Sequence, residues 1–224
     1  LLDVHQQSLD SVERLISWFG LDDHRLRLVK ADASLYQHAV PVHLIVTETM
    51  QKALEQEPQF AVTANLAPQL CPHGIFIPQR IEVELCLADL GSERETYTHS
   101  GRLDTEALVD AGKRCSLGVL LTLEPTHIEL KPVTVVIPTM KNLECLDPLL
   151  FTRIQVIAGY HLQDYEAEIT LPRHCPELQT LQAGERFRVS YALGKYPRFE
   201  FSRLPHSHAA IDRQDLPGDE GGSL

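Results

Sequence analysis

Two glutamates, Glu48 and Glu57, have the spacing and setting that would let them act on a substrate. Glu48 follows shortly after the apolar run Val42–Val46, which is typical of a buried strand in a parallel sheet. Ligands of open α/β sheets bind at the carboxyl ends of such strands, so Glu48 should point into a crevice. Glu57 lies nine positions later, directly before Pro58. This spacing would place the two on opposite faces of a continuous helix, whereas a loop closed by a helix starting at Pro58 would let its ends converge.

Two carboxylates that face one pocket can hold a cationic group through bidentate hydrogen bonds. They can also direct the lone pair of a nitrogen towards an electrophilic methyl group, which is chiefly a matter of positioning and electrostatics. The alternative is that Glu55 and Glu57 are solvated charges of an exposed loop. Spacing alone does not separate these two interpretations, so the surrounding elements have to decide.

A second set of residues could bind a nucleoside. Asp3 follows an apolar stub and precedes an amphipathic helix, where a carboxylate can accept two hydrogen bonds from the vicinal diol of a ribose. In Lys30-Ala31-Asp32-Ala33, small residues would let the backbone approach a flat adenine ring, and Asp32 could accept from its exocyclic amine. Each aspartate has an alternative role, since Asp3 could cap the turn after its strand and Asp32 could cap its own turn.

The elements that would position these residues follow the order strand, helix, strand, strand, helix, strand over residues 1–79, which predicts an α/β sheet. The first helix has Ser8 as its predicted N-cap and Gly20 as its C-terminal stop, with apolar residues at helical spacing between them. The other predicted elements are strands at Leu1–Val4, Arg25–Val29, Val42–Val46 and Ile75–Ile77, and a helix over Gln59–Leu70.

Residues 80–204 have a different pattern, in which apolar and polar residues alternate. Alternation predicts half-buried antiparallel strands, and Gly and Pro punctuate them, so we expect a β-barrel or β-sandwich domain here. The strands are expected at Ile81–Leu87, His127–Leu130, Val133–Ile137, Ile154–Ile157, Tyr165–Thr170, Phe187–Ala192 and Phe199–Phe201. Residues 205–224 are polar and contain several glycines, which predicts a flexible tail.

The segment from Val42 to Leu87 resembles the protein arginine methyltransferases. In that family a strand ends in Ser-Glu, a second Glu follows nine positions after the first, and an amphipathic helix leads to a segment of the type L-x-P-x-G-x-x-x-P before the β-barrel. The corresponding features here are Thr47-Glu48, Glu57, and the run Leu70-Cys71-Pro72-His73-Gly74-Ile75-Phe76-Ile77-Pro78. Residues 1–46 are similar to the ribose-acid and adenine-loop segments of the wider class I methyltransferase fold.

The resemblance implies roles for individual residues. Glu48 and Glu57 would be the paired catalytic glutamates that bind the substrate, with Glu48 also contributing to the cofactor site. S-adenosylmethionine would be the cofactor, with Asp3 as its ribose ligand. Its adenine would contact the stretch Asp32, Ala33 and Ser34.

The resemblance also implies an organisation and a substrate class. Residues 1–79 would be the later part of a Rossmann-like domain that binds S-adenosylmethionine, and residues 80–204 a substrate domain. The methyl acceptor would be a nitrogen nucleophile, either on a basic protein or peptide or on a small-molecule amine. A homodimer is a further expectation.

Several features of the family are changed in this sequence. The family's Trp-Met-Gly after the first Glu is Thr49-Met50-Gln51, and its Thr-His-Trp loop has only a partial counterpart in Thr126-His127-Ile128. The Gly-rich first motif would precede Leu1, where we expect further residues, and no dimerisation arm is recognisable. These departures leave two alternatives open: a binding or scaffold protein that kept the fold and lost catalysis, or a small-molecule methyltransferase.

The composition limits the cellular compartment and the binding partners that we expect. The formal net charge of −11 repels phosphate backbones, so we expect no direct contact with nucleic acid and favour a basic partner. The five cysteines are widely spaced and form no CxxC pair, which indicates reduced thiols in the cytoplasm and no metal site. No apolar run is long enough to cross a membrane, and no signal peptide is recognisable.

Overall fold

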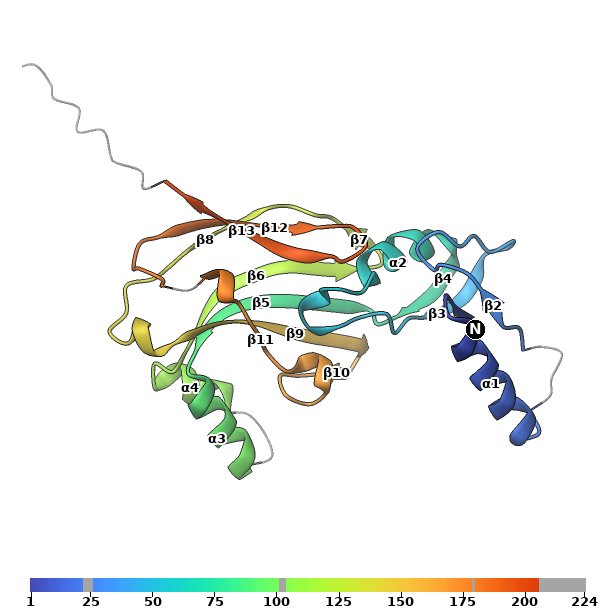
Figure 1. Ribbon diagram of the computed structural model, residues 1–224, viewed down its shortest axis with the longest axis horizontal. Helices are drawn as coiled ribbons and strands as arrows, with labels where there is room; N and C mark the ends of the chain where they lie inside the picture. Colours follow the sequence, from blue (N-terminus) through green and yellow to red (C-terminus); the bar gives the residue numbers. More distant parts are fainter. Residues whose placement is uncertain (22–25, 101–103, 179, 206–224) are drawn as a thin grey trace, which may run out of the picture.

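The computed structural model describes residues 1–21, 26–100, 104–178 and 180–205. It has two unlike parts (Figure 1). Short parallel strands and two helices from the first part of the chain lie at one end, and long antiparallel strands from the remainder form the rest. The chain is therefore a mixed α/β protein in which the parallel and antiparallel strands are segregated.

The first part contains two separate two-stranded parallel sheets. Its elements are β1 (Leu2–Asp3), α1 (Gln6–Trp18), β2 (Val29–Lys30), β3 (Val42–Val46), η1 (Lys52–Leu54), α2 (Gln59–Leu66), η2 (Ala67–Gln69) and β4 (Leu70–Ile77). β1 pairs with β2, and β3 pairs with β4. The predicted order of strands and helices is present, but in the described part of the chain these strands do not form one continuous sheet.

Several local expectations for this part are wrong. The strand predicted at Arg25–Val29 does not form over residues 26–28, and β2 comprises Val29–Lys30 instead. The strand predicted at Val42–Val46 exists as β3, but it is not buried: Leu44 is 55% and Val46 64% exposed, since β4 is the only described element that β3 contacts extensively. The first helix begins at Gln6 with His5 as its N-cap, and not after Ser8. Asp3 turns the chain into the helix, because its Oδ1 accepts a hydrogen bond from the His5 N–H at 2.7 Å.

Residues 80–204, which we call the β-domain, form two antiparallel sheets. The strands are β5 (Arg80–Ala88), β6 (Arg114–Glu124), β7 (His127–Ile128), β8 (Val133–Val136), β9 (Asp147–Ile157), β10 (Tyr160–Leu162), β11 (Arg173–His174), β12 (Arg186–Ala192) and β13 (Arg198–Leu204). One sheet has the order β10-β9-β5-β6-β7, with β11 also on β9, and the other has the order β13-β12-β8. No ladder joins the two sheets among the described strands, so the expected barrel is not closed there.

The core of the β-domain is built on the alternation predicted for β5. Ile81, Val83 and Leu85 are at most 1% exposed and belong to one cluster with Phe187 and Val189 of β12. Complete burial of side chains of this size stabilises the fold by about 1.5–3 kcal/mol each. β5 is also central in its sheet, because β6 pairs with one of its edges and β9 with the other.

Other parts of the β-domain differ from the expected pattern. Two helices lie between β5 and β6, and the sequence pattern predicted neither these helices nor β6. The strand predicted at Tyr165–Thr170 is instead a turn followed by a 3-10 helix. The additional elements are α3 (Leu90–Ser100), α4 (Thr105–Asp110), η3 (Leu143–Cys145), η4 (Glu168–Thr170) and η5 (Pro176–Leu178).

The buried carboxyl group of Glu93 connects α3 to the irregular turn at Tyr165. Glu93 of α3 is fully buried, and its Oε2 accepts a hydrogen bond from the Tyr165 hydroxyl at 2.6 Å. Its Oε1 lies 3.4 Å from Nη1 of Arg114, which also pairs with Asp164 at 2.6 Å. Burial raises the pKa of the Glu93 carboxyl. The helix is thus fixed by polar contacts, so it has no apolar stripe for a periodicity to reveal.

Candidate functional site

The predicted glutamates lie in a loop that the β-domain holds in an unusual conformation. We call residues 47–58 the acid loop. Three of its non-glycine residues, Ala53, Leu54 and Gln56, have positive φ angles of 57°, 55° and 68°. Such backbone is costly and persists only where the surroundings impose it. Ala53 and Leu54 are completely buried in the core of the β-domain.

Hydrogen bonds from three strands or their ends fix this conformation. The Ala53 N–H donates to Oγ1 of Thr152 in β9 at 2.8 Å. The hydroxyl of Tyr191 in β12 donates to the Leu54 carbonyl, and burial raises the pKa of that hydroxyl. The Gln56 N–H donates to the carbonyl of Pro197, just before β13, at 2.8 Å. The acid loop is therefore part of the β-domain's packing and not a free surface loop.

Glu55 is not a solvated charge, contrary to one interpretation of the sequence. It is 7% exposed. Its Oε2 lies 2.7 Å from Nε of Arg173 in β11, and its Oε1 accepts a hydrogen bond from the Phe199 N–H at 3.0 Å. Arg173 also forms two hydrogen bonds with Glu177, which together with the nearby carboxylates raise the pKa of its guanidinium. Glu55 therefore serves as an anchor of the loop.

A buried amide brings the two ends of the acid loop together. Gln59, the first residue of α2, is fully buried. Its Oε1 accepts hydrogen bonds from the N–H and hydroxyl of Thr49 at 3.3 and 2.7 Å, and its Nε2 donates to Oγ1 of Thr47 at 2.8 Å. One side chain thus binds the residues on both sides of Glu48 and lies two positions after Glu57.

Glu48 and Glu57 differ in how they are held. Glu48 is exposed beyond the carboxyl end of β3, at the position the sequence predicts for a ligand-facing acid. Glu57 is half-buried, and its Oε1 accepts a hydrogen bond from Nε2 of Gln51 at 3.0 Å. Two carboxylates near the ends of one clamped loop can orient a cationic group, provided that Gln51 yields its hydrogen bond.

The residues predicted to bind a nucleoside follow β1 and β2, and each aspartate caps a turn. Asp3 is half-buried and uses Oδ1 to accept the His5 N–H. Asp32 is exposed, and its Oδ1 accepts from both the N–H and the hydroxyl of Ser34, at 2.8 and 2.6 Å. The carbonyl of Ala33 accepts from Nδ2 of Asn65 in α2 at 2.9 Å. The stretch is thereby fixed against the helix that follows the acid loop.

These residues retain the chemistry that a nucleoside needs. Oδ2 of Asp3 and Oδ2 of Asp32 have no partner among the residues that the structure describes. Each carboxylate can therefore still accept from a ribose hydroxyl or an exocyclic amine. The carboxylate acceptors at the ends of β1 and β2 fit the hydroxyl and amine donors of a nucleoside, although the hydroxyl of Ser34 already donates to Asp32.

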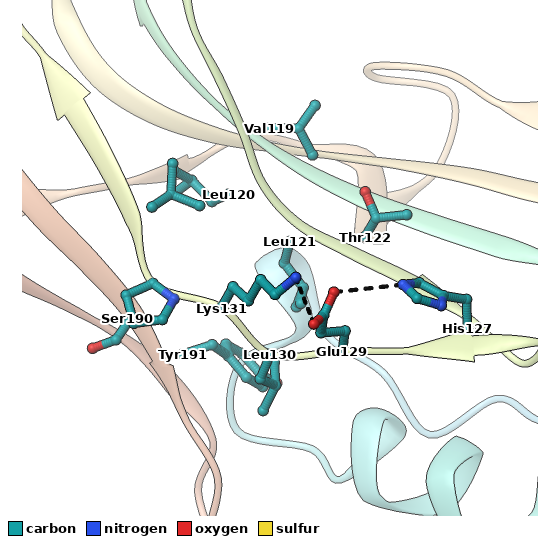
Figure 2. A pocket seen from close by; sticks show the side chains of 12 residues that line it. Val119, Leu120, Leu121, Thr122, His127, Glu129, Leu130, Lys131, Ser190 and Tyr191 are labelled. Atoms are coloured by element: carbon teal, nitrogen blue, oxygen red, sulfur yellow. Dashed lines mark ion pairs between the residues drawn. The ribbon is translucent and has the colours of Figure 1, made fainter.

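A cavity of about 430 Å³ lies in the β-domain, lined by residues of β6, β7, β8 and β12 and of the segment between β7 and β8. Figure 2 shows His127, Glu129 and Lys131 gathered along one side of it. The Lys131 ammonium, which donates to Glu129 at 2.6 Å, holds the pKa of that carboxyl below its usual range. Tyr191 lines the cavity and also binds the acid loop. The full lining is Val119, Leu120, Leu121, Thr122, His127, Glu129, Leu130, Lys131, Pro132, Val133, Ser190 and Tyr191.

The segment Thr126-His127-Ile128 lies at the turn from β6 to β7. A basic side chain does contact the acid loop, but it is that of Arg173 in β11. The sequence offers a weak signal for it, since Arg173-His174 stands between Pro172 and Pro176. Its partner Glu55 is remote in sequence, so no local pattern could have paired them.

Two kinds of feature are absent from the described residues. No helix there is long and apolar enough to cross a membrane. No group of three or more His, Cys, Asp or Glu side chains in the described ranges is arranged to hold a metal ion.

Comparison with solved structures assigns the fold. A chain of the Trypanosoma brucei PRMT1 enzyme–prozyme heterotetrameric complex with AdoHcy matches with a TM-score of 0.50 and 12% identity, over 91% of this chain and 80% of that one. Protein arginine methyltransferase 10 of Arabidopsis thaliana matches with a TM-score of 0.50 and 11% identity, over 85% of this chain and 71% of that one. No family model and no curated protein matches the sequence. At these identities the likeness shows a fold of the arginine methyltransferase type.

Proposed function

We propose that this protein is an S-adenosylmethionine-dependent methyltransferase that transfers a methyl group to a nitrogen nucleophile held by Glu48 and Glu57. The observation that carries the proposal is the acid loop: the β-domain fixes it through strained backbone and a buried Glu55, while Glu48 and Glu57 retain access to solvent. A solvated loop would need neither the strain nor the anchor. In this proposal residues 1–79 contribute to the cofactor domain and residues 80–204 form the substrate domain.

The cofactor would lie at the carboxyl ends of β1, β2 and β3. Asp3 would accept from the ribose, and Asp32, Ala33 and Ser34 would contact the adenine. Glu48 would contribute from the end of β3, which belongs to a separate two-stranded sheet. When bound, S-adenosylmethionine supplies an electrophilic methyl group on its sulfonium. AdoHcy in the Trypanosoma brucei complex supports a cofactor of this class.

The acid loop would act on the methyl acceptor. Glu48 and Glu57 would hold a cationic nitrogen group by hydrogen bonds and so orient the acceptor nitrogen. This nitrogen would lose a proton to one of the carboxylates or to solvent as it gains the methyl group. Gln59 would keep the loop ends together while the acceptor is bound, because it contacts the residues on both sides of Glu48. The β-domain would form one wall of the acceptor groove.

The net charge of −11 supports a basic protein or peptide as the acceptor, and a small-molecule amine is the other possibility. Radiolabelled methyl transfer into a cell extract, separated into protein and small-molecule fractions, distinguishes the two. We also propose that the protein is a homodimer in the cytoplasm, and sedimentation would test whether it is a dimer.

The decisive experiment replaces Glu48, the exposed glutamate of the pair. Glu48→Gln keeps the shape of the side chain and removes its charge, so methyl transfer should be abolished while the thermal unfolding curve is unchanged. Undiminished transfer by Glu48→Gln would contradict the role of this residue.

One observation favours a second function, that of a binding or scaffold protein without catalysis. Gln51 occupies an oxygen of Glu57, and Gln51 belongs to the Thr49-Met50-Gln51 stretch that departs from the family. Calorimetric titration of the protein with S-adenosylmethionine separates the two functions, because the scaffold would release no heat of binding.

A further inference from the structure

The two antiparallel sheets of the β-domain separate where one stretch of chain passes from the first sheet to the second. β7 pairs with the end of β6, and β8 pairs with β12 of the other sheet. Residues 129–132, which connect β7 to β8, belong to no strand. In Figure 1, β8 lies with β12 and β13, whereas β6 lies beside β5. The stretch that starts beside β6 thus ends beside β12, and the sheets diverge along it.

Two strand edges lack a neighbouring strand among the residues that the structure describes. β5 pairs with one edge of β6 from Arg114 to Leu123, but β7 covers the other edge only at Leu123 and Glu124. β8 is the last strand of its sheet, with β12 on one side and no described strand on the other. A strand edge of this kind presents backbone N–H and C=O groups that can pair with a further strand.

The cavity of about 430 Å³ is lined by residues of both edges, Val119–Thr122 of β6 and Val133 of β8. The register of β6 against β5 shifts at Leu120, which is a β-bulge. The bulge explains why Leu120 and Leu121, although adjacent in the chain, are only 6% and 5% exposed. Val119, in contrast, is 40% exposed. The cavity therefore combines an apolar floor with an accessible strand edge.

The charges at the rim of the cavity balance one another. The Glu129 carboxylate lies 2.6 Å from the Lys131 ammonium and 3.5 Å from Nε2 of His127. The other polar side chains of the lining are those of Thr122, Ser190 and Tyr191, which carry no charge at neutral pH. On a chain with a net charge of −11, this site is locally neutral. Complementarity of charge therefore favours an occupant that is itself uncharged.

We propose that this cavity binds an extended, uncharged segment of a partner protein, which adds a strand to the free edge of β6. In this mode of recognition the backbone hydrogen bonds provide affinity, and pockets for alternate side chains provide specificity. The partner segment alternates apolar and small polar residues, because alternate side chains of a strand face opposite sides. Its apolar side chains contact the floor at Leu120 and Leu121. The proposal is independent of the methyl-transfer site.

The test measures binding of a synthetic strand. The fluorescein-labelled peptide Gly-Thr-Val-Thr-Val-Thr-Gly is titrated with the protein, and fluorescence anisotropy is recorded. Two further peptides carry N-methyl groups, one on the amides of both valines and one on the amides of the three threonines. Each of these blocks the backbone donors of one strand edge and keeps every side chain. The unmodified peptide should bind, and at least one methylated peptide should bind about 10-fold more weakly or not at all.

Variants of the protein locate the site. Val119→Arg places a charge beside the free edge of β6 and should weaken binding of the unmodified peptide by about 10-fold. Val119→Thr keeps the shape of the side chain and should bind like the parent protein. Val109→Arg, at a valine of α4 that is 50% exposed, adds the same charge away from the cavity and should have no effect. Thermal unfolding of all three variants should match that of the parent, since both valines are accessible to solvent.

Three results would overturn the proposal. Absence of binding up to about 1 mM protein would mean that the bulge at Leu120 only protects the edge of β6 from pairing. Equal affinity for the unmodified and both methylated peptides would exclude strand addition. A change from dimer to monomer in Val119→Arg, measured by sedimentation, would identify a second copy of this chain as the occupant. None of these results bears on Glu48 or Glu57, so the proposed function is tested separately.

Discussion

Nε of Arg173 in β11 lies 2.7 Å from Oε2 of Glu55 in the acid loop, and this ion pair joins segments that are remote in the sequence. The side chain of Glu55 is 9% exposed and that of Arg173 is 24% exposed, so the pair is screened from most of the solvent. A carboxylate buried in this way depends on its cation. Loss of this pair should therefore weaken the attachment of the acid loop to the β-domain.

Arg173→Ala should destabilise the protein by about 2–4 kcal/mol, because it leaves the buried carboxylate of Glu55 without a cation. Chemical denaturation followed by circular dichroism measures the change. Arg198→Ala is the matched control: it breaks the exposed pair with Glu200, which should cost at most about 1 kcal/mol. Similar losses of stability in both variants would mean that the buried pair of Glu55 and Arg173 stabilises the protein no more than an exposed pair does.

Gln51→Gly should increase the affinity of the acid loop for a cationic acceptor. Gln51 donates to Oε1 of Glu57 at 3.0 Å, and the acceptor must compete with this hydrogen bond. Its removal should strengthen binding of an arginine peptide by about 2-fold to 10-fold, the equivalent of one net hydrogen bond. Anisotropy titration of the variant measures this change. If replacement of Glu57 weakens binding of the arginine peptide but Gln51→Gly leaves its affinity unchanged, Gln51 does not compete with the acceptor.

The stability of the β-domain should depend on pH through Glu93. Burial raises its pKa above the 4.5 of an exposed glutamate, so the folded protein keeps a proton that the unfolded chain has released. The resulting stabilisation is complete below pH 4.5 and is lost as the pH rises through the folded-state pKa. Raising the pH from about 5 to about 8 should lower the thermal midpoint of the parent relative to Glu93→Gln, whose amide still accepts from Tyr165. If the difference in thermal midpoint between the parent and Glu93→Gln does not change with pH, Arg114 keeps Glu93 ionised over the whole range.

The elements that follow local rules could be predicted from the sequence. The apolar run Val42–Val46 is a strand, and the alternation from Ile81 to Leu87 marks the central strand of the β-domain. A helix does begin directly after Pro58, although it ends at Leu66 and continues only as a 3-10 turn. In each case residues close in the sequence interact with one another or share one face of an element.

The contacts that shape the candidate site could not be predicted, because they join remote residues. The sequence offered no role for Glu55 beyond that of a solvated charge, and only the position of Arg173 makes it an anchor. Likewise, Tyr165–Thr170 has the residues of a strand, but the hydrogen bond from Tyr165 to Glu93 holds it in a turn. The burial of β3 was also misjudged, since an apolar run does not reveal what will cover it.

The attachment of the acid loop to strands β9, β11, β12 and β13 has a consequence for how the protein opens. Cooperative opening follows packing and not position in the sequence. The amides of Ala53 and Gln56 should therefore exchange with deuterium together with those of the antiparallel sheets, even though they precede the sheets in the chain. The acids that would face a methyl acceptor should therefore keep their geometry until the antiparallel sheets themselves open.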